Sequence, residues 1–332
     1  MLELRMNAVV VSEPGGPDML QIQEVNRPKP ESHQVLVRVE LAGVNYLDVM
    51  QRSGGTGREV PFIAGVEGMG IVTARGDGVA DIAVGQRVGW MAGSQGSFAE
   101  YTTVDESKAV VIPDSLSDAT AVSSLMQGIT AQYLVNETYP VIKSDVAVVH
   151  AAAGGVGRLL LQMAKLRGAT VIGTTSTKEK SRFIRELGAD YVFGYDDFDT
   201  RTKEVTDGLG ASVVFDGVGE TTFSRSLAAL RIRGTLVVTG AASGPVPPLD
   251  VNGLNTGGSL YLTRPTVAHH IRTKSEIQRR AGEVFKLLET GKLHLGDATE
   301  YPIAQVQDAF TALEDRQTTG KLILRVAGGF TQ

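Results

Sequence analysis

The chain has 332 residues, 42% hydrophobic and 21% charged, which is enough for two domains with an apolar core in each. Its formal net charge is −5 and no basic run is longer than Arg279-Arg280, so we expect no nucleic-acid partner. Cysteine is absent, which excludes disulfides and thiolate metal sites. We see no signal peptide or membrane span and therefore expect a cytoplasmic protein with no membrane partner.

The first 125 residues combine short strand-like runs with glycine-rich turns. Residues 35–40 form the clearest strand, and 70–72 and 86–90 follow between such turns. Short strands at this spacing predict a small, mainly β, barrel-like unit with loops at its rim.

From about Lys143 onward, apolar strands alternate with amphipathic helices. Strands at 146–149 and 170–172 flank a helix at 156–167, and a second helix covers 178–187. Five residues of the first helix recur at helical spacing and predict one buried face: Val156, Leu159, Leu160, Met163 and Ala164. Further strands are predicted at 191–193, 213–215, 236–238 and 258–263. Because these runs are almost continuously hydrophobic, we predict a doubly wound parallel sheet covered on both faces.

The alternation of strands and helices stops after Pro265. Two helices near 275–290 and 304–314 and a strand at 321–324 remain, and they do not form a further βα unit. We therefore assign residues 266–332 as a return segment that completes the first domain. The predicted domains are 1–125 with this return segment, and the wound sheet at 126–265.

A glycine-rich turn joins the strand at 146–149 to the helix that follows it. Residues 152–157 read Ala-Ala-Gly-Gly-Val-Gly, a dinucleotide-binding fingerprint with alanine at its first position. Gly154 lets backbone approach a pyrophosphate, Gly157 lets helix and strand pack closely, and the helix N-terminus supplies free N–H groups. The alternative is a tight turn that binds nothing. The context of strand, turn and helix favours a Rossmann domain.

The end of the second strand indicates which cofactor is bound. An NAD-binding domain places an acidic residue there, whereas residues 173–177 are Gly-Thr-Thr-Ser-Thr. Ser176 can bond a 2′-phosphate and Lys180 can neutralise it, which predicts NADPH. Lys178 and Lys180 could instead be solvated helix charges. Gly173, Gly217 and Gly240 lie at or near strand ends, where close backbone approach to a ligand needs glycine.

The sequence resembles the medium-chain dehydrogenase/reductase superfamily over its whole length, and within it the zinc-free NADPH:quinone oxidoreductases related to zeta-crystallin. The matching stretches are 45–48 (Asn-Tyr-Leu-Asp), 52–54, 65–70, 96–101, 128–131, 150–157, 258–265 and 319–322. The resemblance implies an α/β fold: a GroES-like, mainly β catalytic domain together with a Rossmann domain that binds NADPH.

The zinc ligands of the superfamily's alcohol dehydrogenases are replaced in this chain. Asn45 is near the position of a ligating cysteine, and Val66 replaces the histidine of a Gly-His-Glu triplet. Without that Lewis acid, the substrate must accept hydride easily, as quinones and activated enones do. The resemblance thus implies NADPH-dependent quinone reduction, by hydride or stepwise electron transfer.

The resemblance also implies the residues of the site. Those expected where nicotinamide and substrate meet are Asn45, Tyr46, Asp48, Arg52, Thr130 and Arg264. Those expected at the cofactor are Ala153, Gly154, Gly155, Val156, Gly157, Thr174, Ser176, Lys180, Tyr195, Gly217, Val218, Gly240, Ala241 and Lys321. No metal ligand is expected.

Simpler interpretations exist for several of these side chains. Asp48 and Arg52 could form an i,i+4 helix pair, and Tyr46 and Thr130 could be packing residues. Arg264 could be a charge at a strand end. We interpret His150 as a partly buried histidine at a strand end, with its hydrogen bonds satisfied, rather than as a catalytic base.

Two alternative functions share the predicted fold. One is an NADPH-dependent enone or enoyl-thioester reductase, and the other is an NADPH-binding protein without significant turnover. Met50 replaces a tyrosine that relatives often carry, so the pocket is predicted to be more apolar there. The resemblance also implies a homodimer, formed by pairing the open edge of the last strand across a two-fold axis.

Overall fold

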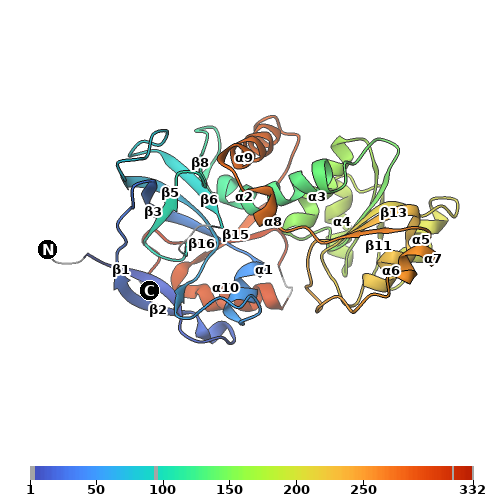
Figure 1. Cartoon of the computed structure of the whole chain (residues 1–332), viewed down its shortest axis with the longest axis horizontal. Helices are drawn as coiled ribbons and strands as arrows, with labels where there is room; N and C mark the ends of the chain where they lie inside the picture. Colours follow the sequence, from blue (N-terminus) through green and yellow to red (C-terminus); the bar gives the residue numbers. More distant parts are fainter. Residues whose placement is uncertain (1–3, 93–95, 316–317, 331–332) are drawn as a thin grey trace. The chain divides into compact units, whose positions relative to one another are not determined.

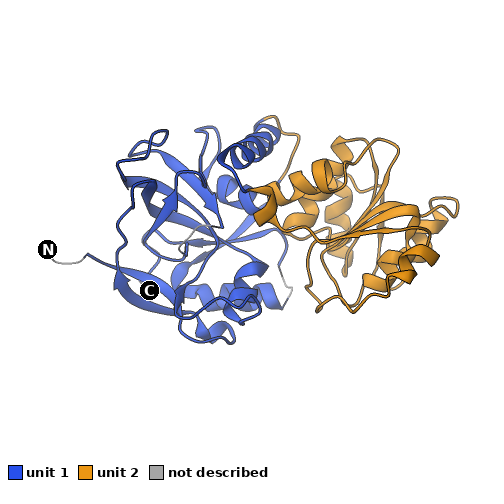
Figure 2. Cartoon of the chain, viewed as in Figure 1, with its two compact units in different colours: residues 1–126, 272–289, 295–332 blue, residues 127–271, 290–294 orange. Residues whose placement is uncertain are grey.

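A computed structural model describes residues 4–92, 96–315 and 318–330 (Figure 1). The chain divides into two compact units (Figure 2). Unit 1 comprises residues 1–126, 272–289 and 295–332, and unit 2 comprises residues 127–271 and 290–294. Most of the return segment therefore belongs with the N-terminal part of the chain. In the described ranges no helix is long and apolar enough to cross a membrane.

Unit 1 is built mainly from two β-sheets. The smaller has the order β2-β1-β4, formed by β1 (Arg5–Val11), β2 (Gln21–Asn26) and β4 (Phe62–Ile63). The larger has the order β15-β16-β3-β5-β6-β8, and β7 also pairs with β3. Its strands are β3 (Gln34–Val44), β5 (Glu67–Arg75), β6 (Arg87–Met91), β7 (Tyr101–Asp105), β8 (Ala109–Val111), β15 (Ala298–Pro302) and β16 (Lys321–Arg325).

The C-terminal strand β16 is part of the larger sheet of unit 1. β16 pairs antiparallel with β3, with Ile323 opposite Gly43. Its apolar residues join the core of unit 1, in which Trp90, Phe98 and Phe310 are buried. The helices of unit 1 are α1 (Tyr46–Arg52), α9 (Lys274–Glu289), α10 (Val306–Glu314), η1 (Pro17–Met19) and η3 (Ile303–Gln305). Helix α2 (Asp118–Tyr133) carries the chain into unit 2.

Unit 2 contains a six-stranded sheet with the order β11-β10-β9-β12-β13-β14. The strands are β9 (Val146–Val149), β10 (Thr170–Thr174), β11 (Tyr191–Phe193), β12 (Ala211–Asp216), β13 (Leu230–Val238) and β14 (Tyr261–Thr263). Every pairing is parallel, which confirms the doubly wound Rossmann sheet. The helices are η2 (Leu134–Thr138), α3 (Gly155–Leu166), α4 (Lys178–Glu186), α5 (Phe198–Glu204), α6 (Phe223–Ala228), α7 (Asn252–Thr256) and α8 (Val267–His270).

The last strand is shorter than the predicted run at 258–263. Gly258 and Ser259 have φ values of +116° and +55°, which a β-strand cannot accommodate. The strand therefore begins at Tyr261, after a turn.

Helix α3 packs closely against β9 and the turn that follows it. The predicted apolar face is buried at Leu159, Leu160, Met163 and Ala164. A Cβ added at Gly157 would overlap the Ala151 carbonyl oxygen and lie 2.9 Å from Ala152 Cα. The absence of a side chain at Gly157 therefore sets how closely helix and strand approach.

We predict that Gly157→Ala destabilises the protein by about 1–3 kcal/mol, because backbone must shift to admit the methyl group. Gly253→Ala is the matched control, since its added Cβ meets no atom within 4 Å. Thermal unfolding should show a lower midpoint for Gly157→Ala alone. Equal midpoints for the two variants would refute the packing argument.

Candidate functional site

The turn between β9 and α3 presents backbone donors without a side-chain cap. Gly154 is the N-cap of α3, with extended φ and ψ of −77° and 175°, and no side chain caps the helix. The N–H groups of the first turn therefore carry the positive end of the helix dipole and suit a phosphate. Gly155 has a second reason to be glycine, because a Cβ there would lie 2.6 Å from the Gln127 amide. This geometry fits the pyrophosphate of a dinucleotide.

The loops after β10 and β11 lie at the same end of the sheet. Thr174 is buried at the end of β10, and Ser176 is exposed just beyond it. Thr177 caps α4 by accepting a hydrogen bond from the Lys180 backbone N–H, at 3.2 Å. The Tyr195 hydroxyl accepts a hydrogen bond from the Ala151 N–H at 3.1 Å, so the structure brings Tyr195 to the glycine-rich turn.

The loops after β12 and β13 pack on one another. The Ser243 hydroxyl and its backbone N–H both donate to the Val218 carbonyl oxygen at 2.8 Å. A Cβ at Gly240 would lie 2.8 Å from the Gly217 carbonyl oxygen, so this contact requires glycine. The carboxyl ends of β9, β10, β12 and β13 thus form one edge, where ligands of doubly wound sheets bind.

Unit 1 contains a buried ion pair between β16 and β5. Lys321 Nζ donates to Glu67 Oε2 at 2.5 Å and to Asn45 Oδ1 at 2.8 Å. Asn45 Nδ2 donates to Glu67 Oε2 at 3.0 Å, and the Met126 backbone N–H donates to Glu67 Oε1 at 2.6 Å. Lys321 is 1% exposed and Glu67 0%, so solvent does not screen the pair. Gly43 leaves the necessary space, since its Cβ would lie 2.9 Å from Lys321 Cε.

Asp48 lies beside this ion pair, in the first turn of α1. Its Oδ2 accepts a hydrogen bond from the Asn45 backbone N–H at 2.8 Å, which completes a capping box. Burial raises the pKa of Asp48 from 3.8 to about 7, against the opposing effects of the Asn45 N–H and the Lys321 charge. This carboxyl group can therefore hold or release a proton near neutral pH.

Arg52 is engaged elsewhere in unit 1. Its Nη1 and Nη2 donate to Glu314 at 2.7 and 3.1 Å, and its Nε donates to the Gly15 carbonyl oxygen at 3.0 Å. The guanidinium group thus joins α1 to α10, and the suggested pairing with Asp48 was wrong. Its expected contact with the substrate stays a prediction that this ion pair does not favour.

The other expected residues differ in exposure. Tyr46 is 43% exposed at the first position of α1. Thr130 is half-buried on α2, and Arg264 is exposed just after β14. Glu67 was not among the expected site residues, although a carboxylate at a buried strand position indicates a partner of opposite charge.

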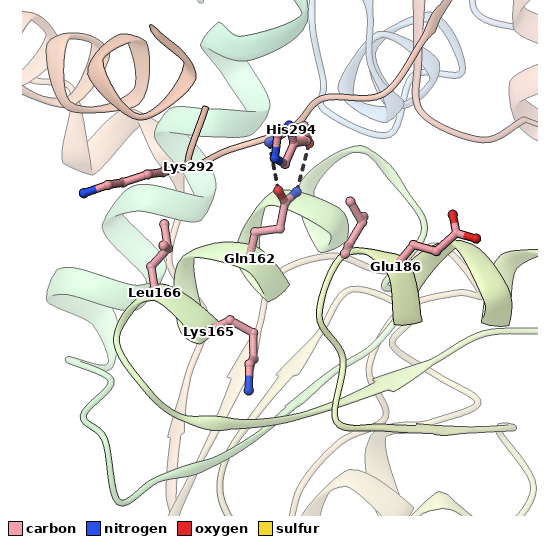
Figure 3. A pocket seen from close by; sticks show the side chains of 7 residues that line it. Gln162, Lys165, Leu166, Glu186, Lys292 and His294 are labelled. Carbon is pink, nitrogen blue, oxygen red and sulfur yellow. Dashed lines mark hydrogen bonds between the residues drawn. The ribbon is translucent and has the colours of Figure 1, made fainter. Parts of the chain in front are cut away.

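The pocket in Figure 3 lies elsewhere in unit 2 and has a volume of about 210 Å³. It is lined by Gln162, Lys165, Leu166, Glu186, Leu187, Lys292 and His294. Gln162 Nε2 donates a hydrogen bond to the His294 carbonyl oxygen at 2.9 Å, and the His294 backbone N–H donates to Gln162 Oε1 at 2.8 Å. The pocket lies at the C-terminal ends of α3 and α4 and contains none of the expected site residues, so it is not the nucleotide site.

Family models match both parts of the chain. Residues 31–114 match the alcohol dehydrogenase GroES-like domain, and residues 155–289 match the zinc-binding dehydrogenase family. The donor set does not fit a zinc ion. The chain has no cysteine, and the described residues contain no cluster of three or more His, Asp or Glu side chains that could hold a metal.

Several known proteins are similar to this chain over almost its full length. A quinone oxidoreductase of Pseudomonas aeruginosa is 37% identical, covering 93% of this chain and 96% of the relative. A 2-haloacrylate reductase of Burkholderia is 35% identical, covering 96% and 98%. The crystal structure of Escherichia coli quinone oxidoreductase complexed with NADPH has a TM-score of 0.94 and 34% identity, covering 96% and 99%.

We predict that Asp48→Asn changes how stability depends on pH. A carboxyl group whose pKa is raised on folding stabilises the native state at low pH, and this contribution is lost as pH rises from about 4 to about 7. Asparagine keeps the cap without titrating. The variant should therefore gain stability relative to the wild type across this range, by on the order of 1 kcal/mol per pH unit. Denaturant titrations at several pH values that gave a constant difference would contradict the assignment.

Proposed function

Since this chain belongs to the quinone oxidoreductases of the medium-chain dehydrogenase/reductase superfamily, we propose that it reduces quinones with NADPH. The observation that carries the proposal is the uncapped start of α3 at the carboxyl edge of a parallel sheet. Such an edge suits a dinucleotide, and the E. coli relative has been crystallised with NADPH.

The proposed cofactor contacts come from loops at this edge. The backbone of residues 153–157 would bind the pyrophosphate, and Ser176 and Lys180 would bind the 2′-phosphate. Tyr195 supports the proposal because its hydroxyl accepts a hydrogen bond from the Ala151 N–H, next to the glycine-rich turn. Residues 173–177 carry no carboxylate to compete with a phosphate, which favours NADPH over NADH.

Bound NADPH supplies a hydride, and the protein must stabilise the negative charge that reaches the quinone oxygen. Preorganised donors are effective at this because they need no reorganisation during the reaction. We propose that Tyr46 donates from its hydroxyl and that Asp48, with its pKa near 7, exchanges the proton. Lys321 and Glu67 hold Asn45 in place. Roles for Thr130 beside the nicotinamide and for Arg264 at the substrate remain part of the proposal.

Reduction of an activated carbon–carbon double bond is the second candidate. The Burkholderia relative, named for the reduction of 2-haloacrylate, is almost as similar to this chain as the quinone oxidoreductases. Both reactions place negative charge on an oxygen conjugated to the carbon that accepts hydride, so the same donors could serve either.

The test is NADPH oxidation against a panel of quinones, haloacrylates, alkenals and enoyl thioesters. We expect turnover with quinones, and NADPH preferred over NADH. Lys180→Glu should raise the Michaelis constant for NADPH at least tenfold and change that for NADH much less, because it replaces the cation at the 2′-phosphate with an anion.

If Lys180→Glu changes the Michaelis constants for NADPH and NADH equally, Lys180 does not bind the 2′-phosphate. Faster turnover of haloacrylates than of quinones would favour the second candidate. NADPH binding without oxidation by any acceptor would indicate a binding protein.

We also propose a homodimer formed through β14. Among the described residues this strand pairs only with β13, and its outer edge has no neighbour. Tyr261 is 60% exposed and Leu262 37%, although both lie in a strand. An apolar, unpaired strand edge of this kind is suited to pairing with a second copy across a two-fold axis.

Light scattering should give about twice the chain mass of 35.2 kDa. Leu262→Arg should lower that mass toward one chain, because it puts a charge on the proposed interface. Leu209→Arg is the matched control, since Leu209 is 72% exposed and lies just before β12, a strand that does not pair with β14. A wild-type mass near 35.2 kDa would rule out the dimer.

A further inference from the structure

A chain of buried polar side chains runs beneath the carboxyl edge of the sheet in unit 2. His150 follows β9, Thr174 ends β10, Asp216 ends β12, and Ser226 lies on α6. His150 Nδ1 is 2.8 Å from Thr174 Oγ1, and its Nε2 is 3.0 Å from Ser226 Oγ. Ser226 Oγ donates to Asp216 Oδ2 at 2.7 Å. All four side chains are buried, so we call them the strand-end network.

The direction of each hydrogen bond in the strand-end network follows from proton counting. Ser226 has one hydroxyl proton and gives it to Asp216, so it must accept from a proton on His150 Nε2. In a neutral ring, His150 Nδ1 is then the acceptor for the Thr174 hydroxyl. Burial lowers the pKa of His150 from 6.5 to about 4, against the attraction of Asp216, which agrees with a neutral ring.

This order of residues is not that of a catalytic triad. In a triad the histidine lies between the acid and the hydroxyl and takes the hydroxyl proton. In the strand-end network Ser226 lies between His150 and Asp216, and its proton points to the carboxylate. Ser226 is also 0% exposed, so no substrate reaches it. The network can act only by fixing the structure around it.

Asp216 also orders the loop that follows β12. Its Oδ1 accepts from the backbone N–H groups of Val218 and Gly219, at 2.9 and 3.0 Å. Thr222 Oγ1 lies 2.9 and 2.8 Å from the two carboxylate oxygens. The N–H groups of Val218 and Gly219 are therefore used inside the protein. A dinucleotide would meet this loop through its shape and not through these donors.

The strand-end network thus ties together three neighbouring strand ends and one loop. His150 precedes the glycine-rich turn directly, and Thr174 accepts a hydrogen bond from the Ala152 N–H through its carbonyl oxygen, at 3.1 Å. We propose that His150, Ser226 and Asp216 are positioning residues for NADPH, holding the ends of β9, β10 and β12 at the spacing that the dinucleotide requires. This inference rests on the proposed function, because it takes NADPH to lie at these ends.

Ser226→Ala removes the central hydroxyl without adding volume. Fluorescence titration should show the dissociation constant for NADPH raised about tenfold, because the ends of β9 and β12 lose the side-chain link that supplements the backbone hydrogen bond from the His150 N–H to the Phe215 carbonyl oxygen. The Michaelis constant for NADPH should rise with it, while kcat changes less than about twofold, since no member of the network touches the reacting atoms.

Val214→Ala is the matched stability control. Val214 is buried in β12 beside the network but has no polar side-chain atom, so this variant should lower the melting temperature and leave NADPH affinity unchanged. A second pair of variants covers the case in which Ser226→Ala does not fold. Thr174→Val removes the hydroxyl that donates to His150 and should weaken NADPH binding. Thr174→Ser retains that hydroxyl and should keep most of the wild-type affinity for NADPH.

Nitrogen-15 spectra of labelled histidine give a readout that mere destabilisation would not move. His150 should be neutral at pH 6 with its proton on Nε2, and Thr174→Val should shift the Nδ1 resonance. A protonated His150 at pH 6, or the proton on Nδ1, would overturn the hydrogen-bond directions. If Ser226→Ala and Val214→Ala alter NADPH affinity equally, or neither alters it, the positioning role is wrong.

These outcomes are separable from a failure of the proposed function. If the wild type binds NADPH and Lys180→Glu weakens binding while Ser226→Ala and Thr174→Val do not, only the strand-end network loses its role. If the wild type does not bind NADPH at all, both proposals fall together.

Discussion

The close contact between α3 and the turn after β9 is the constraint on which the rest of unit 2 depends. Gly157 permits that contact, because any side chain there would enter the Ala151 carbonyl group. The contact aims the first turn of the helix along the carboxyl edge of the sheet, and Gly154 leaves that turn without a side-chain cap. A helix dipole and free N–H groups then meet at one place, which is what an anionic ligand needs.

Burial shifts the pKa of one ionisable side chain in each unit, and in each case it favours the neutral form. In unit 1 burial raises the pKa of Asp48 to about 7, so the native state favours the protonated form and loses stability as pH rises from about 4 to 7. In unit 2 burial lowers the pKa of His150 to about 4, so the native state favours the neutral ring and loses stability as pH falls from about 6.5 to 4. Asp48 is suited to exchanging protons near neutral pH, whereas His150 stays neutral there.

Local pattern predicted the regular elements of the fold, whereas ion pairs between side chains far apart in the sequence escaped it. The period of α3, the apolar strands and the glycine-rich turn are properties of neighbouring residues, so the wound sheet followed from them. The ion pair of Glu67 with Lys321 and that of Arg52 with Glu314 join residues more than 250 positions apart, and a single sequence carries no record of such contacts. Ser259 adopts a positive φ that its residue type does not signal, which is why β14 was predicted too long.

A crystal structure of the NADPH complex tests the central claim most directly. We expect pyrophosphate oxygens within about 3.2 Å of the backbone nitrogens of the first turn of α3, and the 2′-phosphate beside Ser176 and Lys180. A nucleotide bound elsewhere, or a pyrophosphate held only by side chains, would contradict it.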